Sequence, residues 1–217
     1  MSVSAVMVPY GNEAAALTRL RRDLLPALKL LDGDAELIVV DNSPQRLDEL
    51  AEAVCDNGVC PARYRWQGGA NLMYGPAINL AVGLAHHPRV LYVCANHGQS
   101  FDPSWAADLL GPLDIPHVAM TGCLRPAGSP TDHGFPDSLP HHHVQGGVFA
   151  ATRFSLATYP YPEKRYAHWG ADVYQCFRLM HEGWHLVDVP TVRSVWRDEP
   201  GTGNWKFLHR GGGDADE

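Results

Sequence analysis

Apolar residues recur along the chain with two alternating periods. Short continuous apolar runs predict strands that are buried on both faces, and stretches with an apolar residue every three or four positions predict helices. We expect strands at Val3–Val8, Leu37–Val40, Ala62–Trp66, Val90–Ala95, Val118–Cys123, Val144–Ala151, Trp184–Val189 and Val192–Trp196. We expect helices at Ala14–Leu31, Arg46–Val54, Pro76–Ala85, Pro103–Leu110 and Ala171–His181. Because proline interrupts helical hydrogen bonding, the first helix should be kinked or divided at Pro26.

This alternation predicts an α/β fold, with a mixed and mostly parallel sheet that carries helices on both faces. Two stretches rich in Pro, Gly, Ser, Asp and His, at 126–143 and 159–169, predict long loops. A chain of 217 residues fits one domain, which we place at 1–210, and the Gly- and Asp-rich residues 211–217 read as a disordered tail.

Composition and charge exclude several function classes. The formal charge of -7 counts against a nucleic-acid partner, because phosphate binding needs a basic surface. Five cysteines, an odd number without a CxxC pair, predict reduced thiols. Met1 leads directly into a strand pattern and no apolar run is long enough to span a bilayer, so we expect a cytoplasmic protein. Neither a GxGxxG sequence after a strand nor a GxxxxGK[ST] sequence is present, which counts against dinucleotide and P-loop sites.

One predicted strand ends abruptly in polar residues. In the sequence ELIVVDNSPQR, residues 36–46, Asp41, Asn42 and Ser43 directly follow a run of apolar residues that predicts a buried strand. In parallel α/β sheets, ligands bind outside the carboxyl ends of the strands, so these residues are placed where a site would be built. The alternative is a turn that caps the next helix, since Asp, Asn and Ser all cap well.

Five segments in order resemble glycosyltransferase family 2, whose members have the nucleotide-sugar-binding GT-A fold. They are VMVPYGNEAAALTRLRRDLLPAL with ELIVVDNSP, NLMYGPAINLAVGLA, RVLYVCANHGQSFDPSWAADLL, VQGGVFAATR and WGADVYQCFRLMHEGWHLVDVP. The resemblance spans about Val3 to Trp196. It implies a nucleotide-sugar-binding half at 1–125 and an acceptor-binding half at 126–210.

The resemblance implies a donor site, for UDP or a similar nucleotide, at Pro9, Tyr10, Glu13, Asp41, Asn42, Gly75, Asn79, Asn96 and His97. Asp41 would accept a hydrogen bond from a pyrimidine N–H. Glu13 and the backbone around Pro9 and Tyr10 would hold the ribose and frame the base. Gly75 would let the backbone approach a ligand, although Gly75-Pro76 also reads as an ordinary helix start.

The chain departs from the family at the metal-binding motif. Gly98 falls where the family has the aspartate that binds Mg²⁺ or Mn²⁺, and Val195-Trp196-Arg197 stands where a late histidine often follows the last strand. Three alternatives remain open. His97 or Asn96 supplies a metal ligand, protein cations or histidines neutralise the diphosphate, or the protein does not transfer sugar.

Acceptor chemistry is expected in the second half of the chain. Asp172 matches the second acid of the family's Glu-Asp pair and would act as general base, although an acid near a helix start is also favoured by the helix dipole. Gly146 and Gly147 would lie under the acceptor, and His168 and Trp169 would contact it.

Three functions follow from these features. The first is transfer of a sugar from a nucleoside-diphosphate donor to a hydroxyl of a small-molecule or peptide-like acceptor, with inversion and Asp172 as base. The second is a catalytically degenerate GT-A domain that binds a partner or ligand. The third is a metallohydrolase that uses His97, Asp132, His133 and the run at 141–143.

Overall fold

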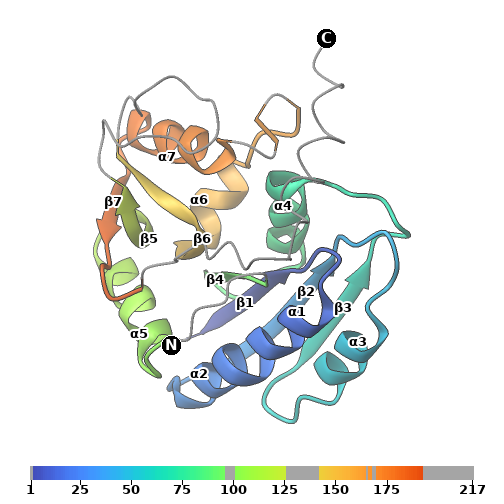
Figure 1. Cartoon of the computed structure of the whole chain (residues 1–217). Helices are drawn as coiled ribbons and strands as arrows, with labels where there is room; N and C mark the ends of the chain where they lie inside the picture. The colour runs from blue at the N-terminus through green and yellow to red at the C-terminus, as the bar shows by residue number, and fades with distance from the viewer. Residues whose placement is uncertain (1, 96–100, 126–141, 165, 168–169, 193–217) are drawn as a thin grey trace.

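The computed structural model describes residues 2–95, 101–125, 142–164, 166–167 and 170–192. In this part of the chain, seven strands form one sheet in the order β3-β2-β1-β4-β6-β5-β7 (Figure 1). The strands are β1 Val3–Val8, β2 Ala35–Asp41, β3 Ala62–Trp66, β4 Arg89–Cys94, β5 Val118–Arg125, β6 His143–Thr152 and β7 His185–Asp188. Strand β6 is antiparallel to both of its neighbours, and every other pairing is parallel. The predicted mostly parallel sheet is therefore confirmed.

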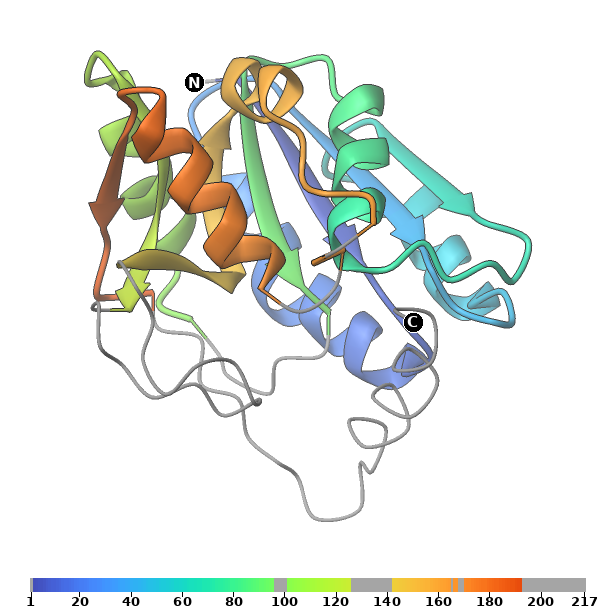
Figure 2. The same cartoon turned by 90° about the horizontal axis from the view of Figure 1, so that it is seen from above.

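Helices cover both faces of this sheet (Figure 2). One face packs against α1 Glu13–Arg19, α2 Leu25–Leu30, α3 Asp48–Cys55 and α5 Trp105–Leu110. The other face packs against α4 Tyr74–Leu84, α6 Arg153–Thr158 and α7 Ala171–His181. Alternate residues of the central strands enter the two apolar clusters, which explains why these strands read as continuous apolar runs. No helix in the described part of the chain is long and apolar enough to cross a bilayer.

The first predicted helix is divided, as expected, but the division precedes Pro26. A π-helical turn, η1 (Leu20–Leu24), separates α1 from α2, and the Leu25 N–H donates to the carbonyl of Leu20. Proline has no N–H and its ring crowds the carbonyl four residues earlier, so a widened turn just before Pro26 relieves that conflict. Arg19 and Asp23 form a buried ion pair of 2.7 Å across this turn.

Three further elements differ from the sequence prediction. A short 3₁₀ helix, η2 (Gly111–Asp114), directly follows α5 and was not predicted. Helix α6 was not predicted; its N-cap is Thr152, whose Oγ1 accepts from the Ser155 N–H at 3.2 Å. The expected strand at 192–196 is not formed at Val192, which lies in a bend, and the rest of that segment lies outside the described residues.

A buried carboxylate organises the amino edge of the sheet. Glu36 on β2 is 5% exposed and accepts hydrogen bonds from Ser4 Oγ at 2.6 Å and from the His86 N–H at 2.7 Å. The Arg63 guanidinium on β3 donates to its other oxygen. Burial acts to raise the pKa of Glu36, but these hydrogen bonds outweigh it and hold the pKa below its ordinary value of 4.5.

Replacing Glu36 with glutamine should lower the free energy of unfolding by about 1–3 kcal/mol at neutral pH, because an amide turns a donor toward groups that donate. The folded-state pKa is depressed, so the carboxylate's contribution is present above the ordinary value of 4.5 and is lost as pH falls through the folded-state pKa. Urea denaturation over acid and neutral pH measures the difference, which should shrink in acid. The exposed Glu52→Gln is the control, and equal effects of the two substitutions would contradict the assignment.

Candidate active site

Asp41 is the last residue of β2, and its carboxylate is used by the chain itself. Oδ1 accepts from the Ser43 N–H at 3.0 Å, and Oδ2 accepts from the Leu47 N–H at 3.0 Å and from the Tyr64 hydroxyl. Asp41 has no exposed surface. Burial, together with the bond to this carboxylate, raises the pKa of Tyr64, which therefore stays a neutral donor. These contacts match the capping alternative, and they leave no exposed edge with which Asp41 could read a base.

Glu13 has a comparable structural role. Its Oε1 accepts from the Leu50 N–H, in the first turn of α3, at 3.1 Å. Free N–H groups in the first turn of a helix need such acceptors. The carboxylate thus ties α1 to α3 through one of its two oxygens.

The loops that follow the first three strands are hydrogen-bonded to one another. The Asn42 N–H donates to the Pro9 carbonyl at 3.1 Å, and the Gly11 N–H donates to Ser43 Oγ at 2.8 Å. The Asn42 side chain, in a residue 4% exposed, donates to Asn71 Oδ1 at 2.8 Å and accepts from the Leu72 N–H at 2.7 Å. Asn42 therefore holds the loop between β3 and α4 instead of offering its amide to a ligand.

Exposed aromatic surface remains at this edge. Trp66, the last residue of β3, is 38% exposed, and its indole Nε1 donates to the Ser43 carbonyl at 3.0 Å. Tyr10 follows β1 and is partly exposed. Tyr10 is among the donor-site residues expected from the sequence. Trp66 is not, because a single exposed aromatic residue at a strand end carries no motif.

Gly75 and Asn79 on α4 contact the segment before α7. A Cβ at Gly75 would lie 2.9 Å from Cβ of Tyr161, and the Gly75 N–H donates to the Ala167 carbonyl at 2.8 Å. The Asn79 amide donates to the Tyr161 carbonyl and accepts from the Tyr161 N–H, both at 2.9 Å. The close backbone approach expected at Gly75 exists, and its partner in this structure is the segment around Tyr161 and Ala167.

Asp172 lies at the start of α7 and contacts β6. Its Oδ2 accepts from the Gly146 N–H at 3.1 Å, and its side chain is 26% exposed. The Tyr74 hydroxyl donates to the Gly146 carbonyl at 2.8 Å, so the Gly146 residue is bracketed from both sides. Burial raises the pKa of Tyr74 well above its ordinary value, and the phenol remains a neutral donor. A partly exposed carboxylate is thus held in a fixed place at the edge where β6 begins.

His143 completes this group of residues. It is the first residue of β6, it is 3% exposed, and its Nε2 lies 4.0 Å from Asp172 Oδ2. Gly147, the other predicted acceptor residue, lies in the same strand and is buried. The sequence pattern drew attention to His143 only as part of a histidine run.

Several predicted site residues lie outside the described residues. They are Asn96, His97, Gly98, Asp132, His133, His141, His168, Trp169 and the late segment Trp196-Arg197. The expected metal ligand His97 is among them. Within the described ranges, no group of three or more His, Cys, Asp or Glu side chains is placed to hold a metal ion.

The run His181-Glu182-Gly183-Trp184-His185 has the H-E-x-x-H spacing of a zinc site. That motif binds zinc when both histidines lie on one face of a continuous helix. Here α7 ends at His181, Gly183 has a φ of +82°, and His185 begins β7. The helix is interrupted inside the motif, so the spacing does not form a zinc site.

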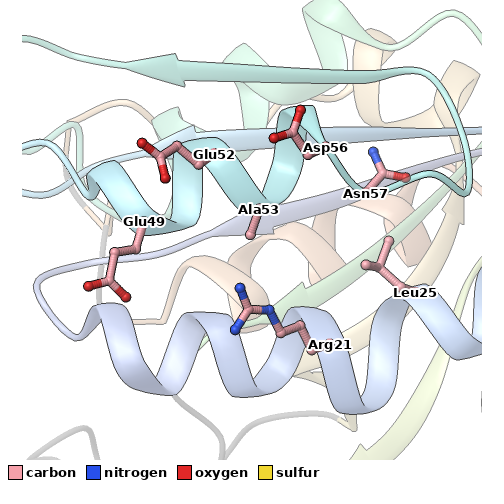
Figure 3. A pocket seen from close by; sticks show the side chains of 7 residues that line it. All are labelled: Arg21, Leu25, Glu49, Glu52, Ala53, Asp56 and Asn57. Atoms are coloured by element: carbon pink, nitrogen blue, oxygen red, sulfur yellow. The ribbon is translucent and has the colours of Figure 1, made fainter.

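A separate hollow of about 570 Å³ lies between α3 and the α1–η1–α2 segment (Figure 3). Glu49, Glu52 and Asp56 line it from α3, and Arg21 points toward that helix from η1. All four side chains belong to exposed residues. This solvated groove lies between helices, on other elements than α7 and β6, which position Asp172.

No protein-family model matches the sequence, and no curated protein sequence matches it. Solved structures do resemble the chain. A mannosyltransferase from Pyrobaculum calidifontis, in complex with GDP-Man and Mn²⁺, matches with a TM-score of 0.69 and 17% identity over 95% of this chain and 60% of its own. A glucosyl-3-phosphoglycerate synthase from Mycobacterium tuberculosis, in complex with Mn²⁺, UDP and phosphoglyceric acid, matches with a TM-score of 0.65 and 16% identity over 96% of this chain and 73% of its own.

A third match is a mannosyl-3-phosphoglycerate synthase from Rubrobacter xylanophilus, with a TM-score of 0.58 and 21% identity over 97% of this chain and 72% of its own. These likenesses show that the chain has the GT-A fold, which confirms the fold expected from the resemblance to glycosyltransferases. This chain spans 60% of the length of the mannosyltransferase chain. At such identities the likeness defines the architecture, and the activity has to be argued from the site.

Replacing Asp41 with asparagine should lower the free energy of unfolding by about 1–3 kcal/mol, because the new amide group faces three donors. Chemical denaturation measures the change. The matched control is the exposed Asp34→Asn, which should stay within about 0.5 kcal/mol of the parent. An Asp41→Asn variant as stable as the parent would refute the capping role.

Replacing Gly146 with alanine should also destabilise the fold. The added Cβ would lie 2.7 Å from the Tyr74 hydroxyl and 3.1 Å from Asp172 Oδ2, and relieving such overpacking costs about 1–3 kcal/mol. Thermal unfolding checks this. Gly83→Ala is the control, because Gly83 lies in α4 with nothing within 4 Å of the added atom, and it should gain about 0.5–1 kcal/mol. A Gly146→Ala variant as stable as the parent would show that Tyr74 and Asp172 leave room for a Cβ at this position.

Proposed function

We propose that this chain is a glycosyltransferase that moves a sugar from a nucleoside-diphosphate donor to a hydroxyl of a small-molecule acceptor. The observation that carries the proposal is a partly exposed carboxylate, Asp172, fixed beside β6 at the edge where the parallel strands of a GT-A sheet end. Its support from known proteins is that the mannosyltransferase neighbour was solved with GDP-Man and the glucosyl-3-phosphoglycerate synthase with UDP-Glc.

Asp172 is assigned the role of general base. The acceptor hydroxyl gives its proton to the carboxylate while its oxygen bonds to the anomeric carbon of the donor sugar. The bond from that carbon to the diphosphate oxygen breaks at the same time, and the nucleoside diphosphate leaves with the electron pair. Attack from the face opposite the leaving group inverts the anomeric centre. The hydrogen bond from the Gly146 N–H holds Asp172 Oδ2 during this step. Rotation of the carboxylate away from the acceptor is therefore disfavoured.

The donor nucleotide is placed at the carboxyl ends of β1 to β4. Because Asp41, Asn42 and Glu13 are used by the chain, the base contact is assigned to Tyr10, the backbone around Pro9 and the exposed ring of Trp66. Aromatic side chains stack on nucleobases, whichever base is present. Asn96 and His97, which follow β4, stay in the proposal as contacts to the diphosphate.

A divalent ion supplies charge neutralisation of the leaving diphosphate in enzymes that use one. The two neighbours named with Mn²⁺ bind it together with their nucleotides. In this chain Gly98 offers no carboxylate, and the described residues contain no ligand cluster. The proposal therefore assigns no step to a metal ion.

Nucleotide binding tests the donor half of the proposal. Isothermal titration with UDP, GDP and TDP, each with and without Mn²⁺, should detect binding of at least one of them, and the same nucleotide should raise the melting temperature. If none binds under either condition, the proposal fails. Binding without any transfer or hydrolysis of the matching nucleotide-sugars would instead favour the non-catalytic GT-A domain.

Replacing Asp172 with asparagine should lower kcat for transfer by about 10²- to 10⁴-fold, because a general base contributes on that scale. Nucleotide affinity should be unchanged, since the residue contacts β6 in the second half of the chain. Asp56→Asn, an exposed aspartate at the end of α3, is the control and should transfer sugar at the parental rate. A variant at Asp172 that retains full kcat would remove this residue from the mechanism.

A further inference from the structure

His143 is placed by the reversal of β6. Because β6 runs antiparallel to β4 and β5, its first residue lies at the edge where the parallel strands end. His143 pairs directly with Arg125, the last residue of β5, and is 3% exposed. A buried imidazole thus lies at the one place in the sheet where the proposed chemistry occurs.

The imidazole of His143 lies close to the Asp172 carboxylate, at the start of α7. Nε2 of His143 lies 4.0 Å from Oδ2, the oxygen that also accepts from the Gly146 N–H, and Oδ1 accepts from the Val173 N–H at 2.9 Å. The His143 side chain is 4% exposed and the Asp172 side chain 26%. The imidazole therefore lies on the protein side of the carboxylate, and the carboxylate opens toward solvent, where an acceptor would enter.

The start of β6 is anchored by contacts that do not involve the imidazole. The Val144 N–H donates to Cys176 Sγ at 3.3 Å, and the Gly146 carbonyl accepts from the Tyr74 hydroxyl at 2.8 Å. These contacts hold the strand on either side of Gln145. These two contacts hold the strand without the imidazole, which lies beside Asp172.

We infer that His143 is a positioning residue for the base, which holds Asp172 Oδ2 so that the carboxylate keeps one orientation toward the acceptor. This inference rests on the proposed function. Catalytic hydrogen bonds are often long in ligand-free structures and tighten in the substrate complex, and the 4.0 Å between Nε2 and Oδ2 is such a long contact. The inferred role of His143 needs no contact with donor or acceptor, because it acts through Asp172.

Two substitutions separate this role from simple packing. In His143→Leu the donor is lost, and kcat should fall by about 10²-fold, the scale of a misplaced catalytic group, with the donor KM unchanged. In His143→Gln a side-chain N–H remains near Oδ2, and most of kcat should return. His185→Gln, at an exposed histidine that begins β7, is the control and should match the parent. Equal kcat in the Leu variant and the parent would overturn the inference.

A second measurement does not depend on activity. The amide proton of Gly146 is bonded to Asp172 Oδ2, so its NMR chemical shift reports the position of that oxygen. The shift should move in His143→Leu in the same direction as in Asp172→Asn and should stay near the parental value in His143→Gln. An unmoved Gly146 signal in His143→Leu would refute the positioning role. If that variant does not fold, His143→Asn, whose shorter side chain withdraws the donor, takes its place in both measurements.

The two kinds of failure are distinguishable. A parent protein that transfers no sugar from any donor defeats the proposed function, and the Gly146 signal still shows whether His143 holds Asp172. A parent that transfers sugar, with a Leu variant that does so equally well, defeats only the role of His143.

Discussion

Every N–H group in the loops that follow the parallel strands needs an acceptor, and this requirement shapes the edge of the sheet. Buried backbone donors that stay unpaired are costly, so the polar side chains nearest to them are drawn into the fold. Asp41 accepts hydrogen bonds from the N–H groups of Ser43 and Leu47. Glu13 accepts from the Leu50 N–H, and Asn42 accepts from the Leu72 N–H. Side chains that look free for a ligand in the sequence are thus used to hold three loops in place.

The side chains at this edge therefore differ between the two halves of the chain. In the first half, the carboxylates and amide at the edge accept hydrogen bonds from the backbone, and exposed surface remains on Tyr10 and Trp66. In the second half, Asp172 keeps part of its carboxylate open to solvent while Gly146 and Tyr74 fix its surroundings. Asn79 on α4 bonds to Tyr161 in the segment before α7, so the two halves are joined by direct hydrogen bonds.

The fold was predictable from the sequence because its signal is repeated. Each central strand enters two apolar clusters, and each such run could be recognised by itself. The short helix α6 was missed because six residues carry little periodicity, and only the cap at Thr152 marks it. For the candidate site, the sequence pointed to individual residues and not to their partners. Asp172 and Gly146 do meet, but the roles of Asp41, Gly75 and Asn79 depend on partners far away in the chain, such as Tyr64 and Tyr161, which no local pattern reveals. The closeness of His143 to Asp172 was not predictable for the same reason, because the two residues are far apart in the chain.

The pairing of Arg125 with His143 has an evolutionary consequence. The chain leaves the sheet at the end of β5 and re-enters it directly opposite, so the connection between them begins and ends at one place beside Asp172. Closing a longer loop between fixed ends costs little, about 0.6 kcal/mol for each doubling of its length. Insertions and deletions there would leave the strand register intact, so the length of this connection can change in evolution while the sheet is inherited unchanged.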